Sequence, residues 1–219
     1  MDSLAAPSTA SILASIAGLG VATFVIITMT SFIKIAVILF LLRNALGIQQ
    51  TPPNMVLYGV ALLLSVYVMA PVATQTYAAA VEPGRSYATL ADYADLVSRG
   101  ARPIRAFMLR FTSPGERTFF TSATARVWGP SAGLDAGPED MLVVVPAFVL
   151  SELQRAFESG FLLYLPFVTI DLVVTAVLLA MGMSSVSPTT ISVPLKLFLF
   201  VAISGWTRLM HGLVLGYAA

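Results

Sequence analysis

Hydrophobic positions gather into long runs in both halves of the chain, with a polar stretch between them. In the last third, residues 161–180 and 193–206 carry one charge each, and the uncharged turn 181–192 joins them. At about 1.5 Å rise per residue, a helix over 161–180 spans about 30 Å, the thickness of a bilayer's hydrocarbon core. The pattern therefore predicts a helical hairpin of membrane scale.

The first apolar run extends from residue 11 to residue 42 and carries a single charge, Lys34. As one straight helix it would reach about 48 Å, well beyond one bilayer, so it must tilt, break or project from the membrane. Thr28, Thr30 and Ser31 precede Lys34, and small or hydroxylated residues favour contacts between helices. We expect this face of the segment to meet protein rather than lipid.

A second apolar run covers residues 55–80. Pro52 and Pro53 cannot continue the preceding helix, and they favour a new helix start directly after them. Pro71 lies inside the run and removes one backbone hydrogen bond, which predicts a kink there. The two runs are expected to form a second helical hairpin.

The stretch from residue 82 to residue 158 has a different character, with eight arginines and nine acidic residues. Apolar residues recur at helical spacing over 86–111, and glycines and prolines mark loops after that. We predict two or three amphipathic helices here, in water or at a polar protein contact. The chain turns apolar again at Met141, and the charged segment 151–160 leads into the last hairpin.

These patterns predict an all-α fold of membrane-associated helical hairpins, with four long apolar helices. The expected parts are an N-terminal apolar hairpin at 1–81, a polar central region at 82–145 and a C-terminal apolar hairpin at 146–219. Arg43 lies in the short loop between the first two apolar runs, whereas the first ten residues hold no Lys or Arg. This bias favours both termini and the central region on the outer side of the membrane.

Composition excludes several classes of function. Hydrophobic residues make up 58% of the chain and charged residues 11%, against about 25% charged in a soluble domain. The net charge is +1 and no run of Lys or Arg is present, so nucleic-acid binding lacks an electrostatic basis. The absence of cysteine removes disulfides and thiolate chemistry. The N-terminus lacks the positive region of a signal peptide, so we expect the first helix to be retained.

Few residues offer chemistry of their own. Asp171 lies within an apolar segment, where an acid can serve as a proton relay, and a proton-coupled solute transporter would use it with Lys34 and Lys196. A membrane hydrolase would need Glu152, Asp171 and His211, but no motif joins them. One histidine without partners predicts no metal site or triad, and no phosphate-binding glycine loop occurs, so no cofactor is expected. No internal repeat is detectable, which disfavours the transporter.

The motifs SFIKI, LLRNALG, PPNMVL and VMAPV follow one another at close spacing in the first half. Further blocks are PIRAFMLR, PAFVLSELQRAFESGF, LPFVTIDLVVTAVLLAMGM and SPTTISVPLKLFLFV. Together they resemble the SctR/FliP/YscR family of type III secretion export-apparatus proteins. The resemblance covers nearly the whole chain except the first ten residues and about 112–140.

The resemblance implies a core subunit of an export gate in the bacterial inner membrane, of the virulence-associated or flagellar kind and without enzymatic activity. Family members form a ring of several copies with SctS-like and SctT-like subunits, and SctU-like and SctV-like components join the apparatus. Unfolded secreted proteins pass through it. In that assembly the apolar segments pack on one another above the membrane plane, which would accommodate an overlong first segment and breaks at Pro71, Pro166 and Pro194.

The family also implies roles for individual residues. A methionine-rich gasket seals the pore, and its matching positions here are Met183, Ser184 and Ser185, next to Met181. Many relatives have methionine at both serine positions, so this seal is expected to be less apolar. The alternative for Met183 is packing inside the core of the hairpin.

Charged positions are expected at contacts between subunits. Glu152 and Lys196 match family positions that pair in the assembled complex, and Lys34 and Arg43 are expected at similar contacts. The alternatives are a Lys196 that snorkels to the interface and a solvated Glu152. Asp171 is expected as a hydrogen-bonded structural acid at a subunit contact. Where relatives commonly have Asp, this chain has Ser204.

Overall fold

A computed structural model describes residues 9–48, 50–81, 89–129 and 136–218. Within these residues the chain forms eight α-helices and no strand. The helices are α1 (Thr9–Thr28), α2 (Phe32–Ala45), α3 (Asn54–Ala80), α4 (Leu90–Phe111), α5 (Pro114–Val127), α6 (Met141–Ala180), α7 (Pro188–Ala202) and α8 (Gly205–Leu215). The all-α prediction is confirmed. The N-terminal residues on which the signal-peptide expectation rests lie outside the described residues.

The overlong first segment is broken into two helices. Ile16–Thr28 and Phe32–Ala45 are bent by 65° at the short break between them. The buried Ser31 donates to Ser65 Oγ at 3.1 Å, and Ser65 donates to Thr30 Oγ1 at 3.1 Å. The break is therefore fixed by hydroxyl groups that contact α3. Of the three expected alternatives, tilt, break or projection, the segment takes the break. The predicted contact of this face with protein is confirmed.

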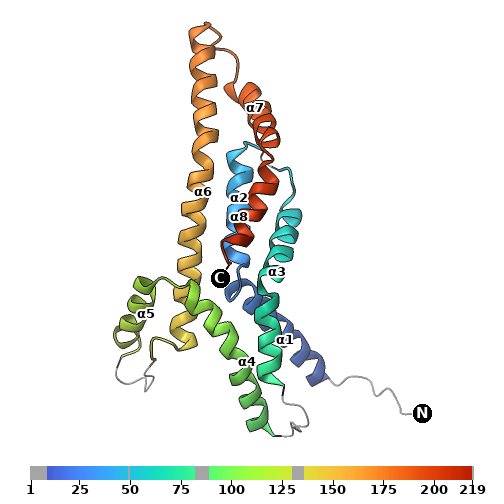
Figure 1. The fold of residues 1–219 in the computed structure, drawn as a ribbon, viewed down its shortest axis with the longest axis vertical. Coiled ribbons are helices and arrows are strands. Elements are labelled where there is room, and N and C mark those ends of the chain that lie inside the picture. The colour runs from blue at the N-terminus through green and yellow to red at the C-terminus, as the bar shows by residue number, and fades with distance from the viewer. Residues whose placement is uncertain (1–8, 49, 82–88, 130–135, 219) are drawn as a thin grey trace, which may run out of the picture.

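The helix α6 is the longest element, with 40 residues, and it forms the long axis of the molecule (Figure 1). At about 1.5 Å per residue it reaches about 60 Å, twice the thickness of a hydrocarbon core. It runs without interruption through the predicted boundary at residues 145 and 146 and through the charged segment 151–160. The charged segment 151–160 and the apolar segment 161–180 are thus parts of one continuous helix.

The expected breaks at Pro71, Pro166 and Pro194 are wrong, because α3, α6 and α7 continue through these prolines. The kink expected at Pro71, within the continuous helix α3, stays a prediction. A proline removes one hydrogen bond of a long helix, and flanking bonds and neighbouring helices can hold the segment together. The last apolar segment breaks elsewhere, between α7 and α8, which are bent by 63°. Ser204 lies there in the left-handed region, with φ of 56°.

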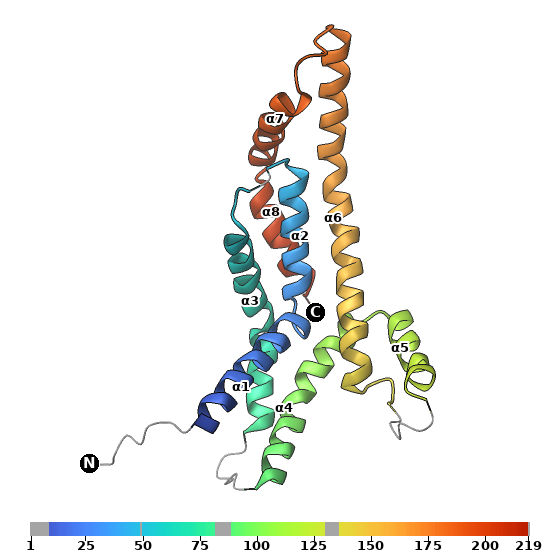
Figure 2. The same ribbon diagram turned by 180° about the vertical axis from the view of Figure 1, so that it is seen from behind.

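Helix α2 lies between α3 and α6 and carries the main core, and Figure 2 shows the same three helices from behind. Ile35, Ile38 and Leu39 of α2 are fully buried and pack in one cluster with Ala61 and Ala156. The small partners on α3 and α6 let the helices approach closely.

The central region consists of two helices, α4 and α5. Helix α4 has the predicted amphipathic pattern, whereas the apolar residues of α5 do not gather on one face. A reciprocal capping box between Thr89 and Asp92 starts α4, while residues 86–88 of the predicted helix lie outside the described part. Helix α4 packs along α3 and against α6, where Phe107 and Met108 join Phe148 in a buried cluster. Helix α5 packs against the same end of α6 (Figure 1).

Among the described helices, α3 and α6 are long and apolar enough to cross a membrane. Up to four spans are present if the bent pairs α1–α2 and α7–α8 each count as one. Many large apolar side chains on these helices are exposed in the single chain. The chain therefore presents apolar faces that lipid or other helices must cover.

The close contact of α2 with α6 yields a testable prediction at Gly160. A Cβ there would lie 2.3 Å from Leu41 Cδ1 and 3.2 Å from Leu41 Cβ, whereas at Gly59 it would meet nothing within 4 Å. We expect Gly160→Ala to lower the free energy of unfolding by about 1–3 kcal/mol, because the helices must separate. Gly59→Ala is the control and should be neutral or stabilising by up to about 1 kcal/mol. Equal thermal shifts of the two variants in detergent would contradict the close packing.

Candidate functional site

The loop 181–187 forms the tip of the C-terminal hairpin. Gly182 ends α6 in the left-handed region, with φ of 74°. Its N–H donates to the Leu179 carbonyl at 3.0 Å, and the Met183 N–H donates to the Leu178 carbonyl at 2.9 Å. These two bonds form a Schellman motif, which satisfies the last carbonyls of α6 and turns the chain back towards α7.

The predicted gasket residues all lie on this loop and are exposed in the single chain. Met181 is 66% exposed and Met183 37% exposed, and Ser184 and Ser185 are exposed as well. The loop stands at the far end of the molecule, away from α4 and α5 (Figure 1). Met183 is therefore not buried inside the core of the hairpin. The hairpin presents these side chains to whatever lies beyond it.

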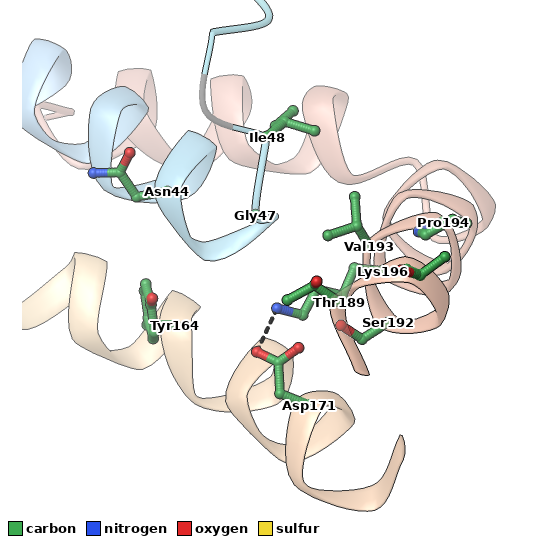
Figure 3. Close-up of a pocket in the computed structure, with 11 residues that line it drawn as sticks. Asn44, Gly47, Ile48, Tyr164, Asp171, Thr189, Ser192, Val193, Pro194 and Lys196 are labelled. Atoms are coloured by element: carbon green, nitrogen blue, oxygen red, sulfur yellow. Dashed lines mark hydrogen bonds and ion pairs between the residues drawn. The ribbon is translucent and has the colours of Figure 1, made fainter. Parts of the chain in front are cut away.

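An ion pair joins the two helices of this hairpin. The Lys196 ammonium on α7 donates to Asp171 Oδ2 on α6 at 2.6 Å (Figure 3). It also donates to the Ala45 carbonyl of α2 at 3.1 Å. Lys196 is buried, whereas 42% of the Asp171 side chain is exposed. A buried ammonium needs such partners, and Ala45 ends α2, where the helix dipole favours a cation.

The pair borders a pocket of about 740 Å³ between the end of α2, α6 and the start of α7. Gly47 lies at the turn after α2 with φ of 77°, and a Cβ there would be 2.8 Å from Val193 Cγ2. The end of α2 thus approaches α7 as closely as the backbone allows. Asn44, Tyr164 and Thr189 also line the pocket (Figure 3). Lys196 of α7 therefore connects α6 and the end of α2 to its own helix, on the side of the loop 181–187 that faces the rest of the chain.

A second charged cluster surrounds Glu152, which is 1% exposed. Its carboxylate accepts hydrogen bonds from Arg155 at 3.2 Å and from the Tyr217 hydroxyl. Arg155 also donates to the Phe111 carbonyl at 2.7 Å, and the Lys34 ammonium lies 4.4 Å from the centre of the Tyr217 ring. Glu152 is therefore a buried acid with two donors, rather than a solvated helix residue.

Arg43 lies apart from both clusters. Its guanidinium donates to Asn54 Oδ1 at 2.6 Å and to the Pro52 carbonyl at 3.3 Å, and it lies over the Phe40 ring at 5.0 Å. Within the chain it thus fixes the connection from α2 to α3.

Several residues that the sequence grouped together have separate partners in the chain. Glu152 bonds Arg155 and Tyr217, while Lys196 bonds Asp171, so these two charges do not pair within one chain. Their predicted pairing between copies stays a prediction. His211 is exposed on α8. The described part of the chain holds no group of three or more His, Asp or Glu side chains that could bind a metal.

Two partners were missed from the sequence. Asp171 and Lys196 lie at nearly equal distances from the loop, and each is the single charge of its apolar segment, so a hairpin places them at the same level. That signal was available. Tyr217 lies 65 positions after Glu152, and nothing in its local sequence indicates the contact.

The fold and its charges define a helical membrane protein in which buried polar contacts join neighbouring helices. The model of the FliP family matches residues 15–213, and the chain belongs to this family. The resemblance to the export-apparatus proteins of type III secretion is thereby confirmed.

Individual relatives cover nearly the same length. The chain is 52% identical over 211 residues to "Probable translocation protein y4yL" of Sinorhizobium fredii, covering 96% of this chain and 95% of that protein. It is 50% identical over 190 residues to "Yop proteins translocation protein R" of Yersinia pestis, covering 86% and 87%. It is 38% identical over 203 residues to "Virulence protein YscR" of Salmonella typhimurium, covering 91% and 93%.

The unequal burial of Lys196 and Asp171 predicts unequal effects of their substitution. Asp171→Asn should lower the free energy of unfolding by about 3–5 kcal/mol, because it leaves a buried ammonium without its carboxylate. Lys196→Met should cost about 1 kcal/mol, since the half-exposed aspartate stays in contact with the pocket. The double variant should regain most of the loss. Thermal unfolding of the purified chain measures all three, with exposed Glu158→Gln as the neutral control; equal single-variant losses would contradict the assignment.

Charge reversal tests which acid is the partner of Lys196. We expect Lys196→Asp to abolish secretion, and Asp171→Lys in the same chain to restore it in part, because the ion pair is re-formed with opposite polarity. Secretion of a reporter substrate measures the rescue. Rescue of Lys196→Glu by Glu152→Lys instead would contradict the pairing within the hairpin and support the pairing between copies.

Proposed function

We propose that this chain is a pore-forming subunit of the type III secretion export gate. In this proposal it assembles in several copies with related subunits in the bacterial inner membrane and closes the channel with its hairpin loop. The observation that carries the proposal is the loop 181–187, whose methionines are exposed at the tip of the hairpin of α6 and α7. The family membership of the chain supports it.

The shape of the chain supports assembly with other helices. Helix α6 is about twice as long as a bilayer core is thick, so it extends beyond a bilayer unless other protein surrounds it. Apolar side chains are exposed on α3, α6 and α7. In our proposal SctS-like and SctT-like subunits and further copies of this chain cover these faces, SctU-like and SctV-like components complete the apparatus, and lipid covers the remaining faces.

The seal follows from the chemistry of methionine. Its unbranched, polarizable side chain adapts to irregular surfaces, so a ring of Met183 side chains from several copies can close a narrow channel and yield to an unfolded polypeptide. Ser184 and Ser185 extend the same loop with small hydroxylated side chains. We place the central helices α4 and α5 on the periplasmic side, following the charge bias around Arg43.

The structure favours this passive role over proton-coupled transport. The acid that a transporter would use, Asp171, is engaged by the buried Lys196, and Lys34 lies at the other charged cluster beside Tyr217. The three residues therefore do not form one relay. The proposed subunit performs no chemistry, and export energy comes from other components.

Replacement of Met183, the methionine to which we assign the seal, tests this proposal. Met183→Gly should make the inner membrane permeable to ions or small solutes, because the ring loses its bulkiest apolar groups. The measurement is growth and dye uptake in cells that express the complete apparatus. Met183→Leu is the matched control, since it keeps the apolar volume, and it should leak little.

Assembly must be confirmed in the same cells, by native mass spectrometry of the purified complex. Unchanged permeability in an assembled Met183→Gly complex would remove the seal from this loop. Robust solute uptake by the purified chain alone in liposomes would instead favour a transporter.

A further inference from the structure

A second cavity lies on the side of the molecule where α8 meets α2 and α6. It has a volume of about 560 Å³, within the range of small-molecule pockets. Its walls are mostly apolar, with Leu162, Phe167 and Leu209 among them, and Pro166 lies in the wall from α6. It shares no lining residue with the pocket beside Asp171 and lies apart from the loop 181–187.

This second cavity, called the groove from here on, is lined by two charged residues, and both are cations. Lys34 and Arg208 line it, and none of its other lining residues is acidic. Lys34 already contacts the Tyr217 ring. The Arg208 guanidinium is exposed and forms no ion pair among the described residues. The groove thus combines apolar walls with the positive charge of Arg208, which no acidic side chain neutralises among the described residues.

The wall formed by α8 leaves room for a ligand. Arg208, Gly212 and Gly216 follow one another at intervals of four residues, so they share one face of the helix and its C-terminal end. A Cβ added to Gly212 would meet nothing within 4 Å. By helical rise, Arg208 and Gly216 are about 12 Å apart, and Lys34 lies beside Gly216. The open glycine surface therefore separates the two cations.

We propose that this groove binds a phospholipid with an anionic headgroup. An acyl chain lies against Leu162 and Gly212, and Arg208 donates hydrogen bonds to the phosphate. Lys34 adds positive potential from the other end of the groove. Basic pockets between membrane helices bind anionic headgroups through the same combination of cations and apolar walls. This site is independent of the proposed seal.

Charge complementarity selects lipid over a second copy of the chain. A protein helix in this groove would need an acid opposite Arg208. Of the three acids on the apolar helices of this chain, Glu152 is buried with Arg155 and Tyr217, and Asp171 is bonded to Lys196. The third, Glu158, is exposed and accepts a hydrogen bond from Gln154 at 3.0 Å. Anionic phospholipid supplies both the apolar chain and the negative charge in one molecule.

The experiment measures lipid bound to the full-length chain. The protein is purified in detergent, mixed with phosphatidylglycerol or phosphatidylcholine, and examined by native mass spectrometry. We expect preferential retention of phosphatidylglycerol, and we expect Arg208→Gln to lower it about fivefold, the effect of one interfacial cation. Gly212→Leu should displace both lipids, because its side chain fills the groove.

The matched control is Arg126→Gln, which removes an exposed arginine on α5 and should leave lipid retention unchanged. Thermal unfolding of each variant confirms that the fold is intact. Equal retention of the two lipids by the unaltered chain, or unchanged phosphatidylglycerol in both groove variants, would overturn the proposal. So would a Gly212→Cys variant that an added thiol-to-amine cross-linking reagent joins to a partner subunit in the assembled complex while no lipid is retained, since the groove would then be a protein interface.

Discussion

The cost of burying charge in apolar surroundings governs how these helices pack. Lys196 lies in an apolar helix, and its ammonium is stabilised by Asp171 on α6 and by the end of α2. Glu152 is held in the same way by Arg155 and Tyr217. A buried ion without its partners costs several kcal/mol, so each cluster allows few arrangements of the helices around it. The two clusters fix α6 against its neighbours at two levels.

The second constraint is length. Helix α6 exceeds a bilayer's thickness about twofold, and the first segment avoids the same problem by bending at Ser31. A rod of this length carries the loop 181–187 far from the polar helices α4 and α5 (Figure 2). Because the Lys196 contacts lie between the loop and the core of α2, they stiffen the hairpin where it leaves the rest of the chain. In the proposed gate, a loop that closes the channel needs such a support.

Much of this architecture could be predicted from the sequence, and the failures have physical causes. The apolar runs located α3 and both hairpins, and the hydroxyl groups before Lys34 marked the contact with α3. The breaks expected at the prolines inside the apolar segments did not form, because a long helix tolerates the loss of one hydrogen bond when its neighbours support it. Nothing in the sequence around Ser204 predicted its left-handed backbone conformation. The contact of Tyr217 with Glu152 depends on tertiary packing, which no local pattern encodes, whereas the pairing of Asp171 with Lys196 was available from hairpin symmetry.

In the proposed gate, loops from several copies meet at one constriction, and cysteine cross-linking tests this arrangement directly. The chain has no cysteine, so Met183→Cys introduces a single thiol per copy. The complex is purified with its partner subunits, oxidised and analysed without reductant, with Val97→Cys on the exposed side of α4 as the control. We expect disulfide-linked copies for Met183→Cys and none for Val97→Cys. An assembled complex in which the Met183→Cys thiols stay unlinked would contradict it.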